Sequence, residues 1–154
     1  VCSSDLSQTD LDSSDNSANV TIFVSSGLAA TLSDLSAGDW LGRRDRMGHL
    51  LETFVVQQVI AQAAWTNPDL RFWHYRDKDQ VEVDVVITRG SKVWGVEVKA
   101  SATLHHSDGN GLRRLAVQAG SDFQSGIVFY DGSTVLQLDG PKILAVPLKL
   151  LWEW

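Results

Sequence analysis

Residues 81–99 read Val-Glu-Val-Asp-Val-Val-Ile-Thr-Arg-Gly-Ser-Lys-Val-Trp-Gly-Val-Glu-Val-Lys, and this stretch decides the fold. It contains two β-type runs, Val81–Thr88 and Lys92–Lys99, which are separated by the turn Arg89-Gly90-Ser91. Two β-branched runs joined by a short glycine turn are typical of adjacent antiparallel strands. Alternation predicts that Glu82, Asp84, Val86 and Thr88 share one face of the first strand and that Val81, Val83, Val85 and Ile87 share the other. In the second strand, Val93, Gly95, Glu97 and Lys99 share one face, and Trp94, Val96 and Val98 share the opposite one.

Periodic patterns on both sides of this hairpin predict the remaining elements. Apolar residues recur at steps of three and four from Met47 to Ala64, which predicts a largely buried helix with Asp45 as its N-cap. Leu70–Arg76 predicts a strand that reaches the hairpin through the turn Asp77-Lys78-Asp79. Further strands are predicted at Val20–Val24, Gly126–Tyr130, Val135–Leu138 and Ile143–Val146, and further helical segments at Leu28–Leu35, Leu112–Ala119 and Leu148–Trp152.

The order of these elements predicts an α/β or α+β fold. Tight turns between the three successive strands indicate an antiparallel three-strand meander. The Gly126–Tyr130 run follows a helix, so a crossover connection to the same sheet is expected. We therefore expect a central mixed sheet flanked by helices.

The two central strands carry the side chains with the clearest chemistry. If their polar faces are presented together, Asp84, Glu97 and Lys99 converge at one end of the sheet. Mg²⁺ or Mn²⁺ prefers oxygen ligands, and Mg²⁺ typically takes one or two carboxylates together with waters and phosphate. Asp84, Glu97 and the carbonyl of Val98 are the predicted ligands, and Lys99 is predicted to orient the attacking water or to stabilise phosphate charge.

Glu52 is the fourth candidate for a role at this site. It lies on the predicted buried helix, where an unpaired carboxylate costs several kcal/mol, so it needs a partner. Gln118, on the helix that follows the third strand, is a possible supporting contact. Arg113 and Arg114 either contact phosphates or form a solvated helix face.

The remaining polar and aromatic candidates have structural interpretations. His105 and His106 are adjacent, so on an extended chain they point in opposite directions, and we interpret them as loop residues rather than ligands of one ion. His49 and His74 are interpreted as satisfied, partly buried histidines. The six tryptophans could stack on bases, but for those in strands, such as Trp73 and Trp94, packing is the favoured interpretation.

Five segments carry a resemblance to a known family. Its general form is a helix acid, an Asp, and then Glu-x-Lys on the next strand, as in PD-(D/E)XK nucleases, and here these are Glu52, Asp84 and Glu97-Val98-Lys99. The segments are Gly48–Val55, Phe72–Asp77, Glu82–Val86, Gly95–Ser101 and Gly111–Leu115. Over about residues 40 to 154 the chain resembles a domain of unknown function, numbered 4143, found at the C-terminal end of many bacterial and archaeal AAA-type ATPases.

This resemblance implies a restriction-endonuclease-like fold and an upstream ATPase domain that this chain lacks. No Gly-x-x-x-x-Gly-Lys-Ser/Thr loop occurs in the sequence, so ATP binding by that route is not expected. The chain departs from the family's Asp-x-Gly-Leu entry pattern, because Ser25 stands where the acid is expected before Gly27-Leu28.

Composition sets further expectations. Residues 1–40 contain six acids and no Lys or Arg, so the rest of the chain has 19 − 6 = 13 acids against 13 bases and no net formal charge. Residues 1–19 are predicted to be disordered, with residues 1–6 non-native, and residues 20–154 to form one domain. No apolar run approaches the roughly 18 residues of a membrane span, and no targeting segment is recognised, so we expect a cytoplasmic protein without a membrane partner.

Two functions fit these patterns. The first is Mg²⁺- or Mn²⁺-dependent hydrolysis of phosphodiester bonds in nucleic acid, with DNA favoured over RNA. The second is a non-catalytic module that keeps the nuclease fold and binds DNA or docks on its ATPase partner. The neutral charge of residues 41–154 and the lack of a basic stripe favour the second function.

Overall fold

A computed structural model describes residue 38, residues 44–139 and residues 142–153, with the backbone alone for residues 44–47. The predicted segments 20–24 and 28–35 therefore lie outside the described residues. The α-helices are α2 (Arg44–Thr66) and α3 (Asn110–Ala119), and the 3₁₀ turns are η2 (His106–Gly109), η3 (Gly120–Asp122) and η4 (Leu148–Leu151). The strands are β1 (Arg71–Arg76), β2 (Glu82–Arg89), β3 (Lys92–Lys99), β4 (Phe123–Tyr130), β5 (Leu136–Asp139) and β6 (Ile143–Pro147).

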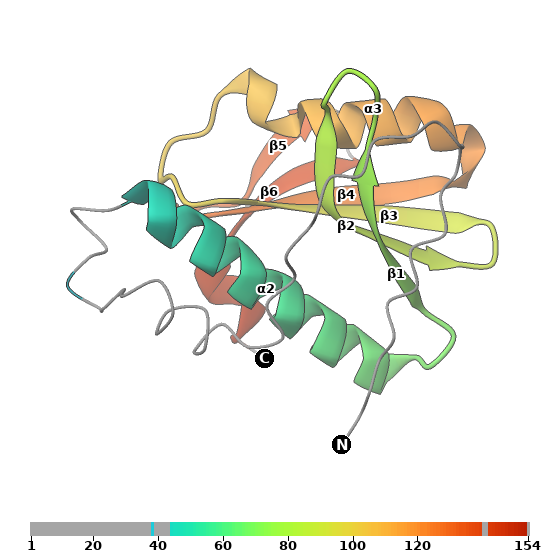
Figure 1. The fold of residues 1–154 in the computed structure, drawn as a ribbon, viewed down its shortest axis with the longest axis horizontal. Helices are drawn as coiled ribbons and strands as arrows, with labels where there is room; N and C mark the ends of the chain where they lie inside the picture. Colours follow the sequence, from blue (N-terminus) through green and yellow to red (C-terminus); the bar gives the residue numbers. More distant parts are fainter. Residues whose placement is uncertain (1–37, 39–43, 140–141, 154) are drawn as a thin grey trace.

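The strands form one six-stranded mixed sheet in the order β1-β2-β3-β4-β6-β5. β1, β2 and β3 pair antiparallel, as the short turns between them predict. β4 joins β3 in parallel through the crossover that contains α3, and β6 continues the parallel part beside β4. The fold is therefore mixed α+β, and the predicted meander and crossover are both confirmed (Figure 1).

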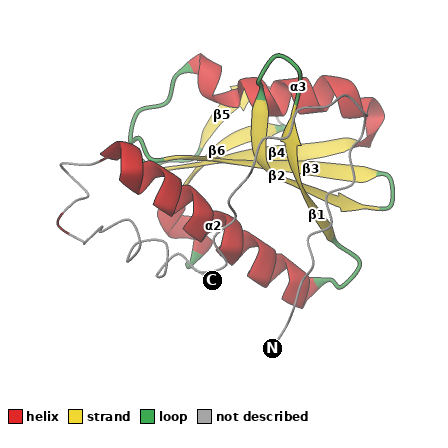
Figure 2. Cartoon of the chain, viewed as in Figure 1, coloured by secondary structure: helices red, strands yellow, loops and turns green. Residues whose placement is uncertain are grey.

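One described helix covers each face of the sheet, as Figure 2 shows. On the face of α2, Val55 and Val59 pack with Val85, Val96 and Val98 of the central strands and with residues of η4. On the face of α3, Leu112 and Leu115 pack with Val83, Val86 and Phe123. The strands of the hairpin are thus buried between two apolar layers, which makes any carboxylate among them costly unless it has a partner.

Most element boundaries agree with the sequence to within three residues. α2 begins earlier than predicted, so Asp45 lies in its first turn and the prediction that it is the N-cap is wrong. The crossover helix also begins earlier, at Asn110, directly after η2. In the part of the chain that is described, no helix combines the length and the apolar character needed to cross a membrane.

The predicted alternation fails at one place in β2. Trp73 pairs with Val86 and Tyr75 pairs with Val83, so one residue of β1 lies opposite Asp84 and Val85 together. This extra residue is a β-bulge, which re-aims the side chains on either side of it. Val83 and Val86 consequently face α3 together, whereas Val85 faces α2, and the prediction that Val83 and Val85 share a face is wrong.

Candidate functional site

The candidate site lies where β2 and β3 stop pairing. Their ladder runs from Arg89↔Lys92 to Val85↔Val96, and no regular pair is formed beyond Val96. Beyond that point the Asp84 carboxyl accepts the hydrogen bond that a backbone carbonyl would otherwise accept, because the backbone N–H of Val98 donates to Asp84 Oδ2 at 2.7 Å. The bulge thus turns Asp84 into the gap between the two strands, and a side chain replaces part of the backbone ladder.

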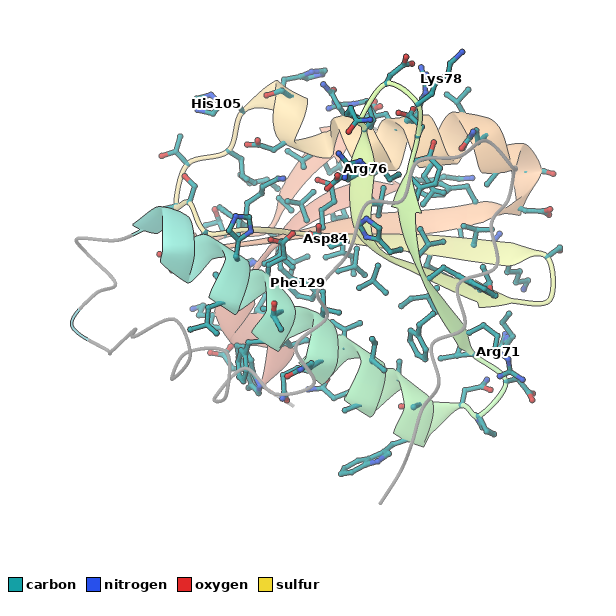
Figure 3. All side chains as sticks on the ribbon, in the orientation of Figure 1. Arg71, Arg76, Lys78, Asp84, His105 and Phe129 are labelled. Atoms are coloured by element: carbon teal, nitrogen blue, oxygen red, sulfur yellow. The ribbon has the colours of Figure 1, made fainter. Side chains whose placement is uncertain are left out.

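Asp84 meets Glu52 from α2 in this gap. The Glu52 carboxyl lies close enough to Asp84 to affect its ionisation. Burial first, and then hydrogen bonding with the Glu52 carboxyl and its nearby charge, raise the pKa of Asp84 from 3.8 to about 7. The Val98 N–H and the Lys99 charge act in the opposite direction. Figure 3 shows Asp84 in the space between α2 and the sheet.

Glu97 enters the same region from the side of α3. It is 4% exposed, and its Oε2 lies 3.5 Å from Lys99 Nζ. Burial raises the pKa of Glu97 from 4.5 to about 7, against the opposing effect of the Lys99 charge, and the Asp84 carboxyl adds to the increase. Glu97 Oε1 is buried and makes no hydrogen bond of normal geometry. A buried oxygen without a partner is costly and therefore marks a position that a ligand could satisfy.

The first turn of α3 presses against this oxygen. A Cβ added to Gly111 would lie 2.1 Å from Glu97 Oε1 and 2.1 Å from the carbonyl oxygen of Glu82. The backbone N–H of Leu112, the next residue, favours the charged form of the Glu97 carboxyl. Glu97 is thus held between Lys99 on its own strand and the N-terminal end of α3.

The four predicted site residues therefore reach one gap from two sides of the sheet. Asp84 meets Glu52 on the side of α2, whereas Glu97 and Lys99 lie on the side of α3, so the prediction of one shared face needs correction. The side chain of Lys99 is 39% exposed, so the gap is open to solvent at this end. Val98 has its side chain in the core, and its backbone N–H bonded to Asp84 places its peptide beside the gap.

The donor set can be tested for its fit to a divalent cation. Within the described residues, no three His, Cys, Asp or Glu side chains are grouped closely enough to hold a metal ion. The site therefore offers at most two convergent protein carboxylates, and this is the number that Mg²⁺ commonly takes when waters and phosphate complete its shell. The unpaired Oε1 of Glu97 and the raised pKa values of Asp84 and Glu97 both describe a place where a cation would be stabilising.

The supporting residues predicted on α3 lie elsewhere. Arg113 pairs with Asp139 of β5 at 3.1 Å, and it also donates to the carbonyl of His106 at 2.7 Å. Arg114 pairs with Asp77 at 3.0 Å and with Asp79 in the turn between β1 and β2. Both guanidinium groups are therefore engaged within the protein. Gln118 is exposed and lies about 10 Å further along the helix axis than Gly111, so it is not brought to the gap.

The histidines and tryptophans have the following positions. His105 and His106 are exposed and lie at the start of η2, so their interpretation as loop residues agrees with the structure. His49 and His74 are both exposed, so the prediction that they are partly buried is wrong. His49 lies next to the candidate site, with its Nδ1 3.4 Å from Glu52 Oε2. Trp73 is 40% exposed and donates to Thr88 Oγ1, and Trp94 is half-buried in β3.

Sequence reasoning missed Gly111 as part of this site. The available signal was a glycine in the first turn of a helix, where a residue with higher helix propensity is expected unless space forbids it. That signal could not identify the contact, because Glu82 and Glu97 are brought to Gly111 only by the folded sheet.

The fold and the site together define a class: a mixed α+β domain with carboxyls and one lysine at a gap between two central strands. The chain belongs to the family described as Domain of unknown function (DUF4143), whose model matches residues 47–151. The matched region begins within α2 and ends with η4, so it includes every residue of the gap. No curated protein matches the chain.

Proposed function

We propose that this chain is a metal-dependent nuclease domain that hydrolyses phosphodiester bonds in DNA. The observation that carries the proposal is the buried Glu97 carboxyl, which has one unpaired oxygen and lies beside Lys99 and the Asp84–Glu52 pair. A structural ion pair would be expected to satisfy both oxygens of a buried carboxylate. Two carboxyls held partly neutral beside a lysine are instead typical of a site that is completed by a ligand.

The residues of the gap have separate roles in this proposal. Asp84 and Glu97, with the carbonyl of Val98, would hold Mg²⁺ or Mn²⁺, and Glu52 would support Asp84. The ion would neutralise negative charge that develops on the phosphate and would make water more acidic. Lys99 lies at the solvent-exposed end of the gap, where its side-chain nitrogen can orient a water molecule or donate to a phosphate oxygen.

The resemblance of the five sequence segments to ATPase-associated nuclease-like domains supports three parts of this proposal. These are DNA as the substrate, a restriction-endonuclease-like fold and an AAA-type ATPase neighbour. The charge of the chain is compatible with a nucleic-acid partner, because the acidic excess lies in residues 1–40. Neither part of the chain carries a basic stripe, so we expect weak binding that depends on the metal at the site rather than on a broad electrostatic surface.

The test is cleavage of plasmid DNA in the presence of Mg²⁺ or Mn²⁺. Lys99→Ala is expected to slow cleavage by about 100-fold or more, because it removes the charge that serves the water or the phosphate. Lys92→Ala is the matched control, since Lys92 is on the same strand at its fully paired end and its cleavage rate should equal that of the unchanged chain. Equal rates for both variants would eliminate this mechanism.

A non-catalytic DNA-binding or ATPase-docking module is the second candidate. It is favoured by the absence, among the described residues, of a three-ligand metal cluster and by the engagement of Arg113 and Arg114 within the protein. Calorimetric titration with Mg²⁺ and Mn²⁺ separates the two candidates. A chain that binds neither ion but still binds DNA would establish the second one.

A further inference from the structure

Gly111 lies in the first turn of α3, directly against the candidate site. Its neighbours in space are the Glu82 carbonyl and Glu97 Oε1, each 2.1 Å from the position that a Cβ would occupy. Real Cβ atoms do not approach oxygen so closely, so any other residue at this position must displace α3, β2 or the Glu97 side chain. The backbone of Gly111 does not have a positive φ, so the requirement for glycine here comes from space and not from conformation.

α3 is also fixed in place from both edges of the sheet. Arg114 pairs with Asp77 and Asp79 at the turn between β1 and β2, and Arg113 pairs with Asp139 of β5. In addition, Leu112 and Leu115 are buried against the sheet between these two anchors. A side chain at position 111 therefore cannot be accommodated by a simple outward shift of the helix without loss of these contacts.

We propose that Gly111 and the first turn of α3 act as the positioning element for Glu97. The glycine lets the helix close over Oε1 and blocks rotamers in which the carboxyl would turn toward α3. Oε2 is thereby kept at 3.5 Å from Lys99 Nζ, and the carboxyl stays at the gap next to Asp84. The consequence for metal binding rests on the proposed function, whereas the contact between Gly111 and Glu97 does not.

A double-mutant cycle on thermal unfolding tests the contact without any activity measurement. Gly111→Ala is expected to lower the Tm by about 10 °C in the unchanged chain and by half of that or less in a Glu97→Ala background. Part of the loss should remain in both backgrounds, because the Glu82 carbonyl is backbone. An equal loss of Tm in the two backgrounds would overturn the proposal.

Gly109→Ala is the matched control. Gly109 immediately precedes α3, its φ is −101°, and a Cβ there would lie 3.4 Å from the nearest Arg113 side-chain atom. This is ordinary contact with the end of a long side chain, so the Tm should change little and should change equally with and without Glu97. A dependence on Glu97 as large as that of Gly111→Ala would show that the effect is not specific to position 111 and would overturn the proposal.

Binding of Mn²⁺, followed by calorimetry, tests the consequence for the site. Gly111→Ala is expected to weaken binding by about ten-fold or more, as is typical when a residue that orients a ligand is changed, whereas Gly109→Ala keeps the original affinity.

If Gly111→Ala does not fold, Glu97→Asp replaces it, because this change withdraws the carboxyl from Gly111 without adding an atom. Glu97→Asp should also weaken binding, and an unchanged affinity would overturn the proposal. If the unchanged chain binds no Mn²⁺, the proposed metal site is wrong, and the unfolding cycle alone decides whether Gly111 positions Glu97.

Discussion

Asp77 and Asp84 belong to the same β1–β2 hairpin, but their surroundings are opposite. Asp77, in the turn, accepts hydrogen bonds from the backbone N–H groups of Asp79 and Val81 and pairs with Arg114. The Val81 hydrogen bond is the largest of the contributions that lower its pKa. Asp84, at the gap, has one backbone donor and lies beside the Glu52 carboxyl, and its pKa is raised to about 7.

This difference separates a carboxylate whose charge is satisfied by protein donors from one that has too few of them. The donors around Asp77 stabilise its charge and fix the turn, so further ligation would gain little there. Glu97 is buried and Asp84 is half-buried, both with too few donors, which costs stability in the absence of a cation. A protein that retains such a cost at one place is expected to use that place for a ligand.

The largest expected effect is on how stability depends on pH. The pKa of Asp84 is raised in the folded state, so its contribution to stability is fully present below about pH 4 and is lost as the pH rises toward 7. Without divalent ions, the loss at pH 8 is on the order of 2–4 kcal/mol. Asp84→Asn removes this loss. Denaturant unfolding at pH 8 should therefore show a higher free energy of unfolding for Asp84→Asn than for the unchanged chain, and at pH 5 this advantage should be smaller.

Asp77→Asn is the matched comparison, because the pKa of Asp77 is shifted in the opposite direction to that of Asp84. The lowered pKa of Asp77 contributes stability that is present above about pH 4 and is lost as the pH falls through the folded-state pKa. Asp77→Asn should therefore destabilise the chain at neutral pH, and the difference should shrink toward pH 3. If both variants changed stability in the same direction at pH 8, the contrast between the turn and the gap would be refuted.

A smaller effect is expected on the protons released when Mn²⁺ binds. At pH 7, Asp84 and Glu97 are both partly protonated, so binding should release about one proton per ion. Calorimetry in two buffers with different ionisation enthalpies measures this number. Asp84→Asn should reduce it, whereas Asp77→Asn should leave it unchanged, and binding enthalpies that are identical in the two buffers would contradict the prediction.

The smallest effect is expected from Arg114→Ala. Its side chain is 45% exposed and its guanidinium is engaged by Asp77 and Asp79, so the Tm should fall by only a few degrees, as for other exposed ion pairs. DNA affinity and its dependence on salt should not change. A salt slope that falls by about one would instead indicate that Arg114 contacts a phosphate, as the sequence allowed.

The regular elements of the described chain were predictable because their causes are local. The alternating apolar runs and the turns at Asp77–Asp79 and Arg89–Ser91 indicate the meander, and the three-and-four spacing after Met47 indicates α2. The bulge at Asp84 and Val85 was not predictable, because strict alternation assumes one residue of β1 for each residue of β2. The exposure of His49 and His74 was also not predictable, because the burial of a side chain depends on which other elements cover it in the folded chain.

The sequence by itself determined which side chains form the candidate site: Glu52, Asp84, Glu97 and Lys99 follow from residue type, spacing and strand pattern, and the family follows from the five segments around them. Only the tertiary structure decided how they meet. The bulge turns Asp84 toward Glu52, and the close approach of α3 at Gly111 confines Glu97 beside Lys99. The physical reason is that protonation and contact depend on neighbours brought together by the fold, from residues that are far apart along the chain.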